Sequence, residues 1–204
     1  MLTLRLIQKS TDEKIIMKIL VTTLITLILI TTGCGPSERE QAQQDERRQQ
    51  LQMQAVESTT EFDEQMSIVL DRYFTLKDAL VESDAETAKV RANTLKSEAE
   101  RVDPEGLNQE SLALWISFKE IIENASDELI REDDIDDQRY HFEFISEAMI
   151  EMVKTFRPVG YTVYHQSCPM VRGGSADWLS REEQIANPYH GDRMMRCGEI
   201  IERI

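Results

Sequence analysis

Cysteine and histidine are scarce in this chain, with three residues of each type among 204. The cysteines are Cys34, Cys168 and Cys197, and no two of them form a CxxC pair. Zinc is therefore disfavoured as a bound metal, since its structural sites usually contain such pairs. A thiol–disulfide enzyme is also disfavoured, because the CxxC motif is what commonly lowers the pKa of a reactive thiol.

The short motifs of several large enzyme classes are missing as well. The sequence contains no GxSxG, HExxH, GxxxxGK[ST] or CxxCH, and its acidic clusters do not have the DxDxDG spacing of a calcium loop. These absences remove the usual signatures of hydrolases, zinc proteases, nucleotide-binding proteins and c-type haem proteins. We therefore expect a protein that is not an enzyme.

Positive charge is in short supply. There are 23 Lys and Arg residues against 38 Asp and Glu residues, which gives a formal net charge of −15. A surface this acidic repels the phosphates of nucleic acid and anionic lipid headgroups, so no nucleic-acid partner is expected. It attracts cations only weakly, because diffuse negative charge is chiefly a solubility feature.

The longest apolar run is short and lies near the N-terminus. Lys18 precedes residues 19–30, which are all apolar or Thr, and Gly33 precedes Cys34. The run is too short for a comfortable permanent membrane helix and suits the core of a signal peptide, with translation starting at either Met1 or Met17. We interpret residues 1–33 as a signal peptide and exclude them from the fold.

The position of Cys34 directly after this segment resembles the lipobox of bacterial lipoproteins. The resemblance implies cleavage before Cys34, acylation of its thiol with fatty acids such as palmitate, and anchoring to a membrane by these chains alone. The protein would then face the periplasm from the inner or the outer membrane of a bacterial envelope. Ordinary secretion with cleavage nearby is the alternative. Residues 34–58 are polar and Gln-rich, which predicts a tether between the anchor and the folded part.

Residues 59–157 carry a helical pattern throughout. Apolar residues recur at steps of three and four in four segments, the third at about residues 109–131. Ser83 with Glu86 has the spacing of a capping box for the second segment, and Pro104 and Pro158 mark two ends. Four amphipathic segments with short connections predict a mainly α fold, a four-helix up-down bundle.

Residues 159–204 differ in character and predict a small, loop-rich C-terminal unit. "YTVYHQ" alternates as a strand does, "SADWLSREEQI" has the pattern of a capped helical turn, and "GEIIERI" is a candidate closing strand. We expect a short two-stranded pairing between the first and the last of these. Residues 59–204 would thus form one helical bundle domain with a C-terminal Cys/Met module.

Sulfur and imidazole side chains gather in this module. Its Cys, Met and His residues are His165, Cys168, Met170, His190, Met194, Met195 and Cys197. Cys168-X-Met170 would place two sulfurs on one side of an extended strand, and Met194-X-X-Cys197 would bring two more together in one helical turn. Thiolate and thioether ligands select Cu(I) and other soft ions. The alternative is a Cys168–Cys197 disulfide, the default for two cysteines in an oxidising compartment.

At this point the residues resemble a known family, the bacterial domain of unknown function 3347. The resemblance rests on "YFTLKDALVESDAETA", "IDDQRYHFEFISEAM", "VYHQSCPM" and "ADWLSREEQIANPYHGDRMMRCGEI", and it extends over about residues 62–201. This family includes small exported proteins and domains fused to the periplasmic adaptor subunits of heavy-metal efflux pumps. The resemblance implies a helical domain with a Cys/Met signature associated with copper or related soft metals.

Carried over to this chain, the resemblance implies the metal ligands Cys168, Met170, Met194 and Cys197. His165, His190 and Met195 are flanking candidates, and the last two replace residues that are usually aromatic and aliphatic in the family. The expected function is a lipid-anchored envelope protein that buffers Cu(I), or Ag(I), or hands it to an efflux adaptor. The alternative is a non-catalytic structural or protein-interaction module in which Cys168 and Cys197 form a disulfide.

Overall fold

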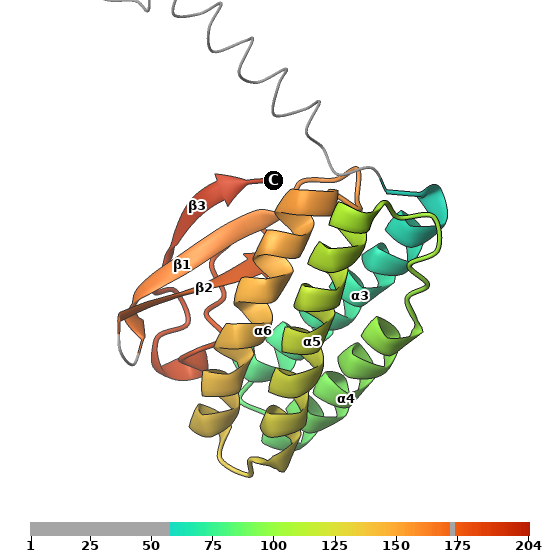
Figure 1. Cartoon of the computed structure of the whole chain (residues 1–204). Coiled ribbons are helices and arrows are strands. Elements are labelled where there is room, and N and C mark those ends of the chain that lie inside the picture. Colours follow the sequence, from blue (N-terminus) through green and yellow to red (C-terminus); the bar gives the residue numbers. More distant parts are fainter. Residues whose placement is uncertain (1–57, 172–173) are drawn as a thin grey trace, which may run out of the picture. The chain divides into compact units, whose positions relative to one another are not determined.

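The computed structural model of the chain describes residues 58–171 and 174–204. Four helices account for the first part of this region: α3 (Thr60–Val81), α4 (Ala85–Arg101), α5 (Gln109–Arg131) and α6 (Ile135–Phe156). They run side by side, each packed against the next along the chain, with α3 also contacting α6 (Figure 1). The expected mainly α fold with four bundled helices is confirmed. The predicted signal peptide, Cys34 and the predicted tether up to residue 57 lie outside the described residues.

The helices begin at side chains that accept hydrogen bonds from the first turn. Thr59, Asp84, Asn108 and Asp134 are the four caps, each bonded to a backbone N–H two or three residues later. The predicted capping box of Ser83 with Glu86 is wrong by one residue, because Asp84 supplies the oxygen that receives Thr87 N. Within the described residues, no helix is long and apolar enough to cross a membrane.

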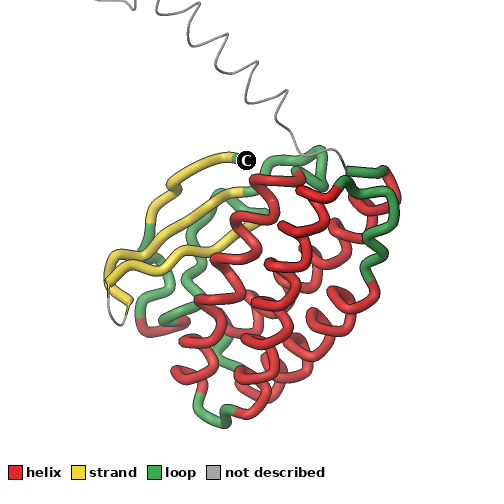
Figure 2. Tube along the Cα trace, in the orientation of Figure 1, coloured by secondary structure: helices red, strands yellow, loops and turns green. Residues whose placement is uncertain are grey.

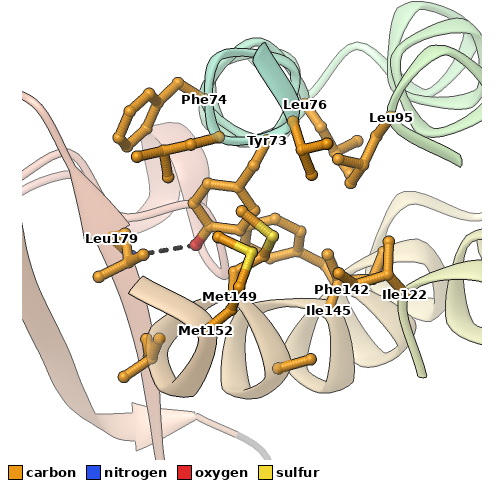
Figure 3. Close-up of a cluster of buried hydrophobic side chains, with 14 of the residues drawn as sticks. Tyr73, Phe74, Leu76, Leu95, Ile122, Phe142, Ile145, Met149, Met152 and Leu179 are labelled. Carbon is orange, nitrogen blue, oxygen red and sulfur yellow. Dashed lines mark hydrogen bonds between the residues drawn. The ribbon is translucent and has the colours of Figure 1, made fainter. Parts of the chain in front are cut away.

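The bundle encloses one apolar core. Its aromatic and sulfur-containing members come mainly from α3 and α6, where Tyr73 stacks on Phe142 at a centroid distance of 5.4 Å. Figure 3 shows these two rings together with Met149 and Met152 of α6, Leu95 of α4 and Ile122 of α5. Every one of these side chains is fully buried. Three small residues of α4, Ala88, Ala92 and Ala99, are also fully buried.

The C-terminal unit is a three-stranded antiparallel sheet with strand order β2-β1-β3, formed by β1 (Tyr164–Val171), β2 (Gly174–Ser180) and β3 (Glu199–Arg203). The expected closing strand pairs as predicted, with Tyr164 opposite Arg203. The predicted helical turn in "SADWLSREEQI" is wrong, since its first part is β2. Trp178 pairs with Gln166 of β1, and this pairing with a neighbouring strand overrides the local helical signal.

The sheet covers one side of the bundle, with β2 packed against α6 (Figure 2). The Leu179 backbone N–H of β2 donates to the Tyr73 hydroxyl of α3 at 3.0 Å, which is the dashed line in Figure 3. The same hydroxyl also hydrogen-bonds with Ser146 of α6 at 2.8 Å. One buried tyrosine thereby joins two helices to a strand at the sheet edge. This contact fixes the position of the strands that carry the candidate site.

Arg139 of α6 makes a second connection between the bundle and the C-terminal unit. Its Nε donates to Pro188 O at 2.7 Å, and its Nη2 donates to Leu80 O and to the Ser83 hydroxyl, each at 2.9 Å. Arg139 as a whole is 4% exposed, and its guanidinium also pairs with Asp136. A buried cation with this many partners holds the 187–198 segment against the α3–α4 turn.

Candidate thiol site

The two C-terminal cysteines come together, although 29 positions separate them in the sequence. Cys168 lies on β1, opposite Ala176 of β2. Cys197 lies just before β3, whose first residue, Glu199, pairs with Ser167 of β1. This antiparallel register brings the two sulfur atoms to 2.9 Å from each other, with both thiols free.

The two thiols differ in their surroundings. Cys168 is fully buried, at 0% exposure, whereas Cys197 is partly exposed. The hydrogen bond with Cys168 raises the pKa of the Cys197 thiol, and burial raises it further. Both effects favour the neutral thiol over the thiolate. The site therefore consists of one inner thiol and one thiol that solvent can reach.

Asn187 holds the segment that carries Cys197. Its Nδ2 donates to Cys197 O at 2.8 Å, and its Oδ1 accepts from Tyr189 N at 2.8 Å. Its own backbone N–H donates to Met195 O at 3.0 Å, and the side chain is fully buried. Nothing in the sequence around Asn187 marks it as a positioning residue. Its positioning role is visible only once the loop is folded.

Gly198 allows the close approach of this segment to the sheet. Its φ is +147°, and a Cβ built on it would lie 2.8 Å from Ser167 O and 2.9 Å from Cη2 of Trp178. Any larger residue would meet backbone on one side and a fully buried ring on the other. The residue after Cys197 must therefore be small for the two sulfurs to meet.

The strand pairing does not place Met170 beside Cys168 as the sequence predicts, whereas the turn expected between Met194 and Cys197 is present. Met170 is 62% exposed, and a register shift in the strand pairing separates it from Cys168, so simple alternation along β1 does not hold there. Met194 and Met195 are partly buried. The Cys197 backbone N–H donates to Met194 O at 2.9 Å, and this bond forms a turn from Met194 to Cys197.

The two histidines face other partners. His165 Nε2 hydrogen-bonds with Asp177 Oδ2 at 2.8 Å, while its Nδ1 has no hydrogen-bond partner among the described residues. His165 lines a pocket of about 320 Å³ together with acidic residues of α6, Glu143, Glu147 and Glu151. Burial raises the pKa of Glu143, and the charges of Glu147 and Asp177 raise it further.

His190 contacts the backbone of Met170 rather than the thiols. Its Nε2 hydrogen-bonds with Met170 O at 2.9 Å, and it lines a separate pocket of about 180 Å³ with Arg139 and Arg193. Of the predicted ligand set, the structure thus brings the two cysteines into contact. It places both flanking histidines in other interactions.

The thiol pair has a separation suited to two kinds of chemistry. Within residues 58–171 and 174–204, no three His, Cys, Asp or Glu side chains converge as they would around a metal ion. The two thiols are soft ligands that already contact each other. A disulfide needs them at about 2.05 Å. Two thiolates bound to one metal lie further apart than 2.9 Å, because the ion stands between them. The 2.9 Å separation lies between the two states, so the sulfurs move together to form a disulfide and move apart to bind a metal.

Comparison with known proteins identifies a family that matches part of the chain. No curated protein and no solved structure is significantly similar to the chain. Residues 69–159 match the family described as protein of unknown function (DUF3347). The match begins within α3 and ends before β1, so it contains the bundle and excludes both thiols. Over residues 69–159, which are less than half of the chain, the sequence is similar to the DUF3347 family.

Proposed function

We propose that this is an exported, lipid-anchored envelope protein that binds Cu(I) through the thiolates of Cys168 and Cys197. Its role would be to buffer the ion or to hand it to a heavy-metal efflux adaptor. The observation that carries the proposal is the 2.9 Å contact between two free thiols from separate segments. Thiolates are ligands that select Cu(I) over harder ions, and here folding has already brought two of them together.

The surroundings of the thiols support a two-thiolate site. Asn187 and Gly198 fix the Cys197 backbone, so little conformational entropy remains to be lost when a metal joins the sulfurs. Met170, Met194 and Met195 lie on the same strand or turn and are auxiliary thioether ligands in the proposal. The net charge of −15 favours the approach of a cation, although only weakly.

The test is a competition for Cu(I) between the reduced full-length protein and a chromophoric Cu(I) chelator under anaerobic conditions. All variants carry Cys34→Ser, so that the third cysteine cannot contribute. We expect one Cu(I) per protein, and loss of competition in the Cys168→Ser/Cys197→Ser double variant. Met170→Leu should weaken binding less than either cysteine change. If the double variant competes as well as the two-thiol protein, the proposal is wrong.

A second candidate is a non-catalytic interaction module in which the two cysteines form a disulfide. The same short distance favours it, because an exported protein meets an oxidising compartment. Closing a loop of this length stabilises a protein by about 3–4 kcal/mol in the chain-entropy model. Thiol counting on protein isolated from the envelope separates the candidates. A fully oxidised pair that resists reduction favours the disulfide module, and titratable thiols favour the metal site.

A further inference from the structure

The two thiols differ in access to solvent, and this difference assigns them an order of reaction. Cys197 is partly exposed and is followed by the exposed start of β3. Cys168 is fully buried in the central strand β1, opposite Ala176, which is itself 3% exposed. Of the two thiols, Cys197 is therefore the one that a disulfide in solution reaches first, because Cys168 must first be uncovered.

We infer that the domain carries out thiol–disulfide exchange with solvent-accessible disulfides, with Cys197 as the attacking thiol and Cys168 as the resolving thiol. This activity uses the same two side chains as the proposed metal site but does not depend on metal binding. The chemical class of the substrate is a low-molecular-weight or exposed protein disulfide. The strand register supplies the proximity of two thiols that a CxxC motif supplies elsewhere. The raised pKa of Cys197 reduces its thiolate fraction, so the exchange is slower at neutral pH than at alkaline pH.

The reaction balances in two steps. The Cys197 thiolate, its proton lost to water, attacks one sulfur of the disulfide, so that a mixed disulfide forms and one substrate thiolate leaves. The Cys168 thiolate, likewise deprotonated, then attacks the Cys197 sulfur, which forms the Cys168–Cys197 bond and releases the second substrate thiolate. The protein dithiol is oxidised by two electrons, and the substrate disulfide is reduced to two thiols.

The structure favours rapid resolution of the mixed disulfide. The sulfurs are already 2.9 Å apart, and the Cys197 carbonyl and N–H are fixed by Asn187 and Met194. The loop cannot carry Cys197 away from Cys168 without breaking these bonds. The mixed disulfide should therefore be short-lived when Cys168 is present and persistent when it is absent.

The experiment measures the reaction of dithiodipyridine with reduced full-length protein in the Cys34→Ser background. The protein with both thiols should release two equivalents of thiopyridone and end as an internal disulfide. Cys168→Ser should react at a similar rate but release one equivalent and retain the other as a mixed disulfide. Cys197→Ser, which keeps only the buried thiol, should react at least about tenfold more slowly, because buried thiols are inert.

Two controls keep the result interpretable. In urea, the two single-cysteine variants should react equally fast, which shows that burial and not chemistry separates them. In protein with both thiols, a substoichiometric dose of iodoacetamide followed by peptide mapping should label Cys197 in preference to Cys168, a measurement that needs no variant at these positions. Equal labelling, or equal rates for the folded single-cysteine variants, would overturn the assignment. Failure of the Cu(I) competition would not affect the order of thiol reactivity, and equal thiol reactivity would not affect the Cu(I) competition.

Discussion

At the scale of single residues, the site depends on the absence of a side chain at Gly198, the residue after Cys197. Gly198 has no side chain, and this permits the last segment to lie against Ser167 and Trp178. Trp178 is fully buried and its indole N–H has no hydrogen-bond partner among the described residues. The space next to the thiols is therefore already filled by the ring, with no room for a Cβ.

Gly198→Ala should destabilise the reduced protein by about 1–3 kcal/mol, because it adds a clash to a backbone conformation that L-residues avoid. It should also weaken Cu(I) binding by separating the two sulfurs. Urea unfolding and the chelator competition measure the two effects. Gly160→Ala is the matched control, because a Cβ there meets nothing within 4 Å. Equal behaviour of the two variants would contradict the packing described for Gly198.

At the scale of elements, the first turn of α6 holds the loop that leads to Cys197. Asp136 accepts hydrogen bonds from Arg193 of the 3-10 turn η1 (Gly191–Arg193) and from Arg139 of its own helix. The hydrogen bond from Arg193 is the main reason that the pKa of Asp136 falls below its ordinary value of 3.8. This ion pair joins the bundle to the loop at the protein surface.

The lowered pKa of Asp136 gives stability a dependence on pH with a definite sign. The folded state binds the Asp136 proton less tightly than the unfolded state, so the contribution is present above the ordinary pKa and is lost as pH falls through the lowered value. Asp136→Asn should therefore reduce the urea midpoint at pH 7 and should lose less stability than the unmodified protein on acidification below about pH 5. Asp192→Asn is the control, since Asp192 is exposed and has no ion pair with the described residues. A pH profile unchanged by Asp136→Asn would contradict the role of this pair.

The helices could be predicted from the sequence, whereas β2 and the contact between the thiols could not. The four helices follow from the periodicity of apolar residues, and the segment 109–131 was predicted at its observed limits. β2 could not be predicted in the same way, since Ser175 and the acidic residues after Trp178 imitate a helix start. The contact of Cys168 with Cys197 was likewise open, because the register of β3 on β1 decides it. The exposure of Met170 depends on an irregularity in strand pairing that no local pattern signals.

At the scale of the whole molecule, the bundle and the sheet form one unit through buried polar contacts. Tyr73 lies between α3, α6 and β2, and burial raises its pKa well above the usual range, so the hydroxyl stays neutral and can serve both partners. The family match ends at residue 159, which is where the chain leaves the bundle for the sheet. The thiols are thus carried by a sheet that lies outside the matched residues and packs against the bundle.

Tyr73→Phe should destabilise the protein by about 1–3 kcal/mol, because it leaves the Leu179 N–H without its buried acceptor. In the variant, the Leu179 amide should exchange faster than it does in the unmodified protein, because β2 loses its contact with α3. Amides in the middle of α4 should exchange at unchanged rates. Tyr140→Phe is the matched control, since Tyr140 is 49% exposed on α6. An effect of Tyr140→Phe as large as that of Tyr73→Phe would count against this role of the buried hydroxyl.

The most direct test of the metal-binding proposal is X-ray absorption at the copper edge of the protein loaded with one equivalent of Cu(I), in the Cys34→Ser background. The expected result is a first shell dominated by at least two sulfur ligands, which changes to oxygen or nitrogen ligands in the Cys168→Ser/Cys197→Ser variant. A first shell of oxygen and nitrogen in the protein that retains both thiols would contradict the proposal that Cys168 and Cys197 hold the metal.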